Sequence, residues 1–162
     1  MATRIREKQY GAGVRTDVRL WLRLLSCSTI IEKRLRRRLV EQFDTTLPRF
    51  DALATLERHS EGLAMSELSR ALLVSNGNVT SIVRQLEAAG HVASRPSEKD
   101  GRSSVVTLTA AGRDHFRELA AAHHGWIGHM FAGMSTEQQT ELYALLDSLK
   151  ASIGSAGGEG EE

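Results

Sequence analysis

The segment "MSELSRALLVSNGNVTSIVRQLEAAG", residues 65–90, constrains the fold of this chain more than any other part. Ser66 is placed to cap a short helix that ends near Leu73. A tight turn at Val74–Ser75 then leads into a second helix, expected over about residues 76–89. Two helices joined by so short a turn predict a helix-turn-helix.

The hydrophobic pattern changes from a helical period to alternation directly after this motif. Val92 and Ser94 are expected to lie opposite Val106 and Leu108 in an antiparallel pair. The polar loop between them contains an Asp-Gly pair, which favours a tight turn. A β-hairpin that follows a helix-turn-helix predicts a winged helix.

The second helix of the motif has one apolar face and one polar face. The apolar residues, expected in the core, are Val79, Ile82, Val83 and Leu86. The polar face should expose Asn76, Asn78, Thr80, Ser81, Arg84 and Gln85, with Ser75 at the helix start. Amides pair with adenine, arginine with guanine or phosphate, and threonine contacts the thymine methyl, while a helix N-terminus favours phosphate. We therefore expect this face to contact double-stranded DNA rather than only water.

The hairpin tip carries Lys99, Asp100 and Arg102. An arginine held at a narrow loop can enter the minor groove, where negative potential concentrates. The carboxylate two residues away can orient the guanidinium. A solvated turn would account for the Asp-Gly pair but not for the arginine, so we predict a second DNA contact here.

Long helices are expected on both sides of this motif. Apolar residues recur at helical spacing over about residues 16–43, and a stripe of Leu142, Leu145, Leu146 and Leu149 follows a capping box of Ser135 and Gln138. Between them we expect a helix with Pro48 in its first turn, closed by Gly62, and a helix over about 110–132 capped by Thr109. Because one small lobe cannot bury the first and last stripes, we expect a homodimer.

The composition is that of an ordinary globular chain with a net formal charge of +1. The segment "GSAGGEGEE" holds three glutamates and no cation, is expected to be disordered, and leaves +4 on the rest of the chain. A single cysteine, no evident signal peptide and no long apolar run indicate a cytoplasmic protein with no membrane partner. No phosphate loop, metal box or nucleophile elbow is present, so we expect no enzyme, no catalytic residue and no cofactor.

The stretch "EKRLRRRL", residues 32–39, concentrates five cations in an almost neutral chain. If Leu35 and Leu39 are buried, Arg36 and Arg38 lie at the rim of the buried stripe. Glu32 and Glu41 can each pair with an arginine, but two acids do not neutralise five cations. The cluster is either a solvated helix face or a second phosphate-binding patch, for DNA or for the phosphates of a ligand.

The chain resembles the multiple-antibiotic-resistance regulator (MarR) family over roughly residues 16–150. "SEKDGRSSVVTLTAAG" looks like the wing signature of that family, and "MSELSRALLVSNGNVTSIVRQLEAAGHV" looks like its helix-turn-helix. The resemblance implies a fold that is mainly α with a small β-hairpin wing, a homodimer built from the first and last helices, a palindromic operator and a ligand pocket. The implied division is an arm (1–15), a dimerisation region (16–47 and 109–153), a DNA-binding lobe (48–108) and a tail (154–162).

"RLWLRLLSCSTIIEKRLRRRL", "TTLPRFDAL" and "VSNGNVT" also resemble the repressors of aromatic-acid catabolism that respond to CoA thioesters. This narrower resemblance implies an aryl-CoA effector such as p-coumaroyl-CoA. The acyl group would lie near Trp21 and Phe50, although aromatics at helical spacing are more often core residues, and the phosphates would lie near Arg36 and Arg38.

Two other candidate sites have simpler explanations. Cys27 could sense oxidants, but its apolar neighbours favour a small core residue over an exposed, electropositive thiol. His115, His123, His124 and His129 lie on one predicted helix and could hold zinc, but no cysteine or dense acid cluster accompanies them. Surface or interface roles are expected for these histidines, and no metal site is predicted.

Overall fold

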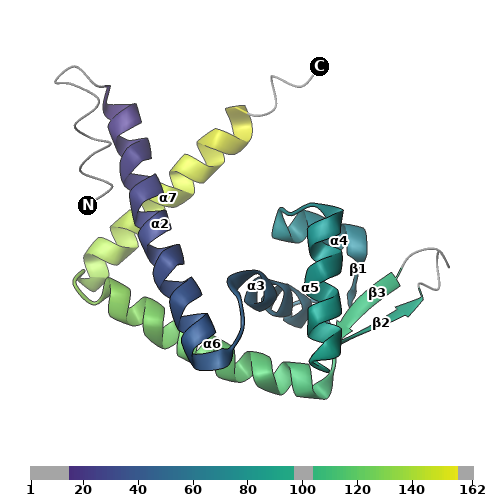
Figure 1. Ribbon diagram of the computed structural model, residues 1–162. Coiled ribbons are helices and arrows are strands. Elements are labelled where there is room, and N and C mark those ends of the chain that lie inside the picture. The colour runs from purple at the N-terminus through teal and green to yellow at the C-terminus, as the bar shows by residue number, and fades with distance from the viewer. Residues whose placement is uncertain (1–14, 97–103, 157–162) are drawn as a thin grey trace. The chain divides into compact units, whose positions relative to one another are not determined.

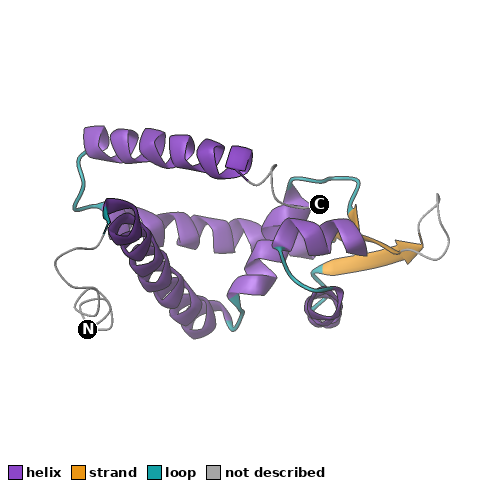
Figure 2. Cartoon of the chain, turned by 90° about the horizontal axis from the view of Figure 1, so that it is seen from above, coloured by secondary structure: helices purple, strands orange, loops and turns teal. Residues whose placement is uncertain are grey.

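The computed structural model describes residues 15–96 and 104–156 (Figure 1). These residues form two compact units, which are divided after His123. The first unit contains α2 (Thr16–Phe43), α3 (Leu47–Glu57), β1 (Leu63–Ala64), α4 (Met65–Leu72), α5 (Asn76–Ala88), β2 (Val92–Pro96), β3 (Ser104–Leu108) and the first part of α6 (Ala110–Phe131). The second unit contains the rest of α6 and α7 (Thr136–Ala156). The described chain is mainly helical, with strands confined to one small sheet (Figure 2), which confirms the expected fold class.

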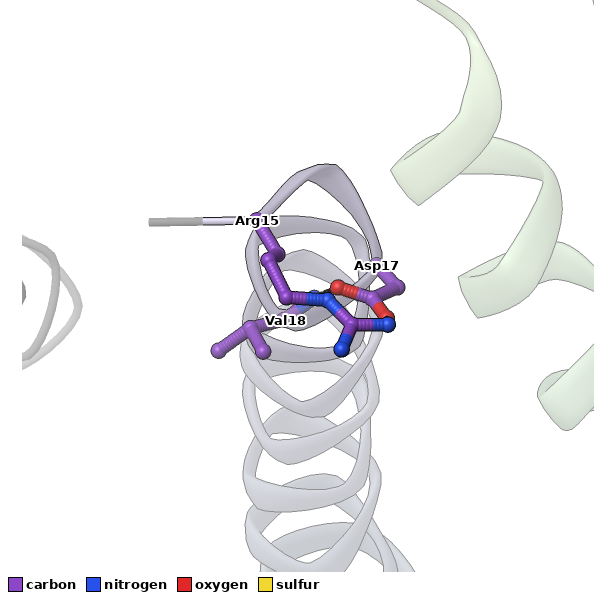
Figure 3. Close-up of polar contacts among 3 residues, drawn as sticks. All are labelled: Arg15, Asp17 and Val18. Atoms are coloured by element: carbon purple, nitrogen blue, oxygen red, sulfur yellow. Dashed lines mark hydrogen bonds and ion pairs between the residues drawn. The ribbon is translucent and has the colours of Figure 1, made fainter. Parts of the chain in front are cut away.

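Helix α2 begins where the sequence predicted, at Thr16, and its first turn carries an acid. The Arg15 guanidinium forms an ion pair with Asp17 at 2.6 Å, and the other Asp17 carboxylate oxygen accepts the Val18 N–H at 2.8 Å (Figure 3). A carboxylate at this end of a helix is favourable because the N-terminus carries a partial positive charge. Leu35 and Leu39 are the buried residues of α2, as expected.

The core of the first unit lies among α3, α4, α5 and the sheet. Figure 1 shows α4 and α5 side by side next to the hairpin, and the large side chains most fully buried here include Leu53, Leu56, Leu68 and Val79. All four residues predicted for the core face of α5 are buried. The predicted helix-turn-helix is therefore built around its own apolar core.

The sheet is antiparallel with the strand order β1-β3-β2. Val92 pairs with Leu108 and Ser94 with Val106, which is the predicted register. Strand β1 was not predicted, because two residues are too short to show a period. Gly62 precedes it with φ +86°, and a Cβ there would lie 2.5 Å from the Val106 carbonyl oxygen.

Three predicted boundaries were wrong. Helix α3 ends at Glu57, so Gly62 belongs to the turn before β1 and does not close the helix. Helix α4 begins at Met65, so Ser66 lies inside it. The Ala64 N–H is instead accepted by the Glu67 carboxylate at 2.8 Å. Helix α7 reaches Ala156, so the predicted disordered tail begins too early, and residues 157–162 lie outside the described part.

Two predicted helix starts are confirmed. The Thr109 hydroxyl accepts the Gly112 N–H at 2.9 Å at the start of α6. Ser135 and Gln138 form the reciprocal capping box before α7, at 2.9 and 3.3 Å. Over residues 15–96 and 104–156, no helix is both long enough and apolar enough to cross a membrane.

Candidate nucleic-acid interface

The turn between α4 and α5 sets the direction of the polar helix. The Ser69 hydroxyl is largely buried and donates to the Val74 carbonyl at 2.6 Å, which ties the turn to α4. Leu73 adopts a left-handed backbone with φ +53°, and its side chain is 92% exposed. Ser75 then caps α5 by accepting the Asn78 N–H at 3.4 Å, as its predicted position at the helix start requires.

The exposed face of α5 carries the predicted polar residues. Five of them are exposed, namely Asn76, Asn78, Ser81, Arg84 and Gln85. Thr80 is half-buried, and its hydroxyl donates to the Asn76 carbonyl at 2.8 Å, so it offers chiefly its methyl group. The face therefore combines amide, hydroxyl and guanidinium groups on a helix whose opposite side is fixed in a core, which is the arrangement that base-edge recognition needs.

One polar residue that contacts this face was not predicted from the sequence. Arg49, in the first turn of α3, donates from Nε and Nη2 to the Gln85 Oε1 at 2.7 and 2.5 Å. The Gln85 Nε2 in turn donates to the Ser81 hydroxyl at 3.2 Å. Arg49 and Gln85 are 36 positions apart in the chain, so no local pattern could have revealed this contact.

The base of the hairpin is fixed to the end of the helix-turn-helix. The Thr109 hydroxyl also donates toward the Gly90 carbonyl at 2.7 Å, and the Thr109 N–H donates to the His91 carbonyl at 3.0 Å. A Cβ at Gly112 would lie 1.8 Å from that same carbonyl oxygen, so glycine is required for this close approach. The predicted tip residues Lys99, Asp100 and Arg102 lie outside the described residues.

The basic cluster of α2 is partly neutralised within the chain. Arg36 pairs with Glu32 through both Nε and Nη2, and Arg37 lies 3.8 Å from Glu41, as the spacing predicted. Partial removal from water raises the pKa of the Asp51 carboxyl, while the attraction of Arg36 opposes that rise. Arg36 thus has acidic neighbours on both α2 and α3, although its side chain stays exposed. Arg38 is half-buried.

The two aromatic residues that were predicted to contact a ligand lie in different environments. Trp21 is 58% exposed on α2, whereas Phe50 is buried. Phe50 stacks on His123 with ring centroids 4.8 Å apart and contacts Phe116 at 5.9 Å. A ligand could therefore reach Trp21 directly, but it would reach Phe50 only by displacing packed rings.

The expectation that Cys27 is a core residue was wrong, because its side chain is exposed. The apolar residues around Cys27 in the sequence suggested a core position, but few side chains in that part of α2 are covered within one chain.

The histidines of α6 have different surroundings rather than a common site. His115 stacks on His91 with centroids 4.1 Å apart, and His123 stacks on Phe50. Burial lowers the pKa of His115 below its usual value, and the nearby His91 lowers it further against the opposing effect of Glu118. In the described part of the chain, no three His, Cys, Asp or Glu side chains are grouped to hold a metal ion.

The fold and this face define a winged-helix DNA-binding protein, and comparison with known proteins gives its family. Residues 43–103 match the sequence profile of the MarR family. The chain is 32% identical to the transcriptional activatory protein BadR of Rhodopseudomonas palustris over 148 residues, which cover 87% of this chain and 84% of BadR. It is 36% identical to the HTH-type transcriptional repressor Rv2887 of Mycobacterium tuberculosis over 104 residues, covering 64% and 74%.

A solved structure agrees with these relatives. The crystal structure of a MarR family transcriptional regulator from Silicibacter pomeroyi superposes with a TM-score of 0.74 and 30% identity, covering 89% of this chain and 99% of that one. The chain therefore belongs to the MarR family of transcriptional regulators, which bind DNA and are not enzymes.

Proposed function

We propose that this regulator binds a palindromic operator as a homodimer, with α5 in the major groove and the hairpin as a wing. The observation that carries the proposal is the exposed face of α5, whose amide, hydroxyl and guanidinium groups stand over a buried apolar face. The side chains assigned to DNA on α5 are Ser75, Asn76, Asn78, Thr80, Ser81, Arg84 and Gln85. Lys99, Asp100 and Arg102 are assigned to DNA on the wing.

The distribution of exposed apolar side chains supports the homodimer. Outside Leu73, the large apolar side chains that the described residues expose all lie on α2 or α7. They are Leu20, Trp21, Ile30 and Val40 on α2, and Tyr143, Leu145, Leu146 and Ile153 on α7. A second copy that covers these faces would remove their apolar surface from water. The domain division proposed from sequence, with residues 16–47 and 109–153 for assembly and 48–108 for DNA, fits this distribution.

The homodimer and its operator can be tested together. Light scattering should give the mass of two chains at micromolar concentration, and footprinting should show two half-sites about one DNA turn, ~10 bp, apart. A monomer at that concentration would contradict the proposal.

The wing is tested by Arg102→Ala. The variant should bind the operator more weakly by about 1–3 kcal/mol, with the dimer intact. Unchanged affinity would remove the wing from the mechanism.

We infer repression as the mode of action, so that a bound dimer blocks transcription until an effector releases it. The two relatives carry opposite labels, since BadR is named an activatory protein and Rv2887 a repressor. A reporter gene placed under the operator should become more active when the regulator gene is deleted. Lower activity on deletion would reverse the assigned sign.

An aryl-CoA thioester is proposed as the effector, on the resemblance of α2 and α3 to regulators that respond to such compounds. Trp21 exposes its aromatic ring in a single chain and would lie at the edge of the face covered in the proposed homodimer, where an acyl group could still contact it; Arg36 and Arg38 offer cations. Trp21 and Arg36 are separated by fifteen residues of α2, or about 22 Å along a helix, so only an extended ligand could reach both. The phosphates of the ligand and of DNA would then compete for the arginines.

The effector proposal makes two separable predictions. Arg36→Ala and Arg38→Ala should weaken DNA binding, and each lost phosphate contact should reduce the slope of log affinity against log salt by ~0.9. A gel-shift should show release of DNA by p-coumaroyl-CoA but poor release by free p-coumarate or CoA. Parent-like DNA binding by both variants would make the cluster a solvated face, and equal release by the free acid would contradict the thioester.

An oxidant-sensing repressor is the second candidate, and the exposure of Cys27 favours it. Treatment with hydrogen peroxide should then release the parent from DNA but not Cys27→Ser. Release of both proteins, or of neither, would exclude the thiol mechanism.

A further inference from the structure

The contact between α3 and α5 gives Gln85 a role different from that of a direct base reader. The guanidinium of Arg49 has only donors, so the group that faces it must be an acceptor. The Gln85 amide is therefore turned with Oε1 toward Arg49, and both Nε and Nη2 of Arg49 donate to that one oxygen. This orientation follows from the chemistry of the partners and leaves the amide nitrogen pointing toward Ser81.

Gln85 consequently lacks a free acceptor for adenine. Two hydrogen bonds from glutamine to adenine need the amide oxygen to accept from N6 and the amide nitrogen to donate to N7. In this structure the oxygen already accepts two N–H groups from Arg49, and the nitrogen donates to the Ser81 hydroxyl at 3.2 Å. Gln85 thus connects Arg49 to Ser81.

These hydrogen bonds, from Arg49 to Gln85 and from Gln85 to Ser81, determine which role the Ser81 hydroxyl can take. The Ser81 oxygen accepts from Gln85, so its own O–H remains to donate outward from the exposed face. The neighbouring Thr80 differs, because its hydroxyl is directed back to the Asn76 carbonyl at 2.8 Å. Ser81 can therefore donate a hydrogen bond to DNA, whereas Thr80 offers DNA its methyl group.

We propose that Arg49 is a specificity-determining positioning residue that, through Gln85, fixes Ser81 as a hydrogen-bond donor to one operator base. This inference rests on the proposed DNA-binding function of α5. The base facing Ser81 should present an acceptor in the major groove, such as purine N7, guanine O6 or thymine O4. Arg49 acts on that choice from another helix, without being a base reader itself.

The experiment begins with an operator selected by the parent protein from randomised DNA duplexes. Affinities are then measured for every single-base substitution, at several salt concentrations, with the parent and four single variants. The variants are Arg49→Ala, Arg49→Lys, Gln85→Ala and Ser81→Ala, and the double variant Arg49→Ala/Gln85→Ala completes a cycle. Arg58→Ala, at the far end of α3, removes the same charge from an exposed site and is the matched control.

The expected result is a loss confined to one base-pair position. Arg49→Ala, Gln85→Ala and Ser81→Ala should each reduce discrimination there about tenfold, a factor within the range of one base contact. The double variant should lose no more than the single variants, because they interrupt one chain of hydrogen bonds. Arg49→Lys should also lose discrimination, since an ammonium lacks the planar fork, and Arg58→Ala should match the parent.

Two results would overturn the inference. A uniform loss on all sequences, with a salt slope lower by ~0.9, would make Arg49 a phosphate contact. Unchanged discrimination in Arg49→Ala would make the contact to Gln85 irrelevant to recognition. If instead the parent selects no sequence from the pool, the proposed operator-binding function itself fails, and the inference fails with it.

Discussion

Helices α5 and α2 are both amphipathic, but only α5 has its apolar face covered within one chain. The thirteen residues of α5 bury four apolar side chains, whereas the 28 residues of α2 bury two. On α2, Leu20, Trp21 and Ile30 are instead exposed. The difference shows that the winged helix completes its own core within one chain, while the proposed homodimer would supply the surface that covers α2.

The largest expected effect is on assembly. Trp21→Glu places a charge on the exposed apolar face of α2, where burial against a second copy would require the charge to be desolvated. Light scattering should show single chains, while the circular dichroism of the helices is largely retained. A variant that remains dimeric would show that this part of α2 is not the assembly surface.

Truncation of a buried side chain on α5 should instead destabilise the fold. Leu86 is buried on the core side of α5, so Leu86→Ala should lower the free energy of unfolding by about 2–5 kcal/mol. Urea denaturation in the Trp21→Glu background, where no second copy should cover α2, measures this loss, and Val40→Ala, on an exposed part of α2, is the comparison. Similar losses in the two variants would contradict the contrast between the helices.

Two glycines of the first unit should respond in opposite ways to the same substitution. Gly112→Ala would place a Cβ against the His91 carbonyl and should lower the free energy of unfolding by about 1–3 kcal/mol. Gly77, in α5, has open space around it, so Gly77→Ala should stabilise the protein by about 0.5–1 kcal/mol through a better helix propensity. Thermal melting of both variants tests the pair, and a stabilising Gly112→Ala would refute the close approach.

The smallest effect concerns pH at the base of the hairpin. Because burial and His91 lower the pKa of folded His115, the unfolded chain binds a proton there more readily. The contribution of His115 to stability is therefore complete above its ordinary pKa of about 6.5 and is lost as pH falls below it. His115→Gln should flatten the dependence of the urea midpoint on pH between about 5 and 7. An unchanged pH dependence would exclude His115 as its source.

The sequence predicted those parts of the fold whose signals are local and periodic. The extent of α2, the core face of α5, the hairpin register and the caps at Thr109 and Ser135 all follow from spacing and residue type. Strand β1 was missed because two residues carry no period. The exposure of Cys27 was missed because apolar neighbours along a sequence do not show whether any surface covers them.

The candidate site could be predicted only in part for the same reason. The residues of α5 that face outward follow from the helical period, but their hydrogen-bond partners do not. Gln85 was assigned to an adenine edge from its residue type alone. Its contact with Arg49 depends on how α3 packs against α5, which local sequence does not encode.

If the exposed face of α5 reads DNA sequence, fluorescence anisotropy on a selected operator should show it. The parent and Arg84→Ala are titrated against the operator, its single-base variants and a scrambled duplex, with Arg58→Ala as the matched control. Two chains should bind each operator, and the parent should strongly prefer the operator over scrambled DNA. Arg84→Ala should lose about 1–3 kcal/mol of operator-binding free energy and should discriminate less at one base-pair position. Equal affinity of the parent for operator and scrambled DNA, or parent-like specificity in Arg84→Ala, would show that this face of α5 does not read the sequence.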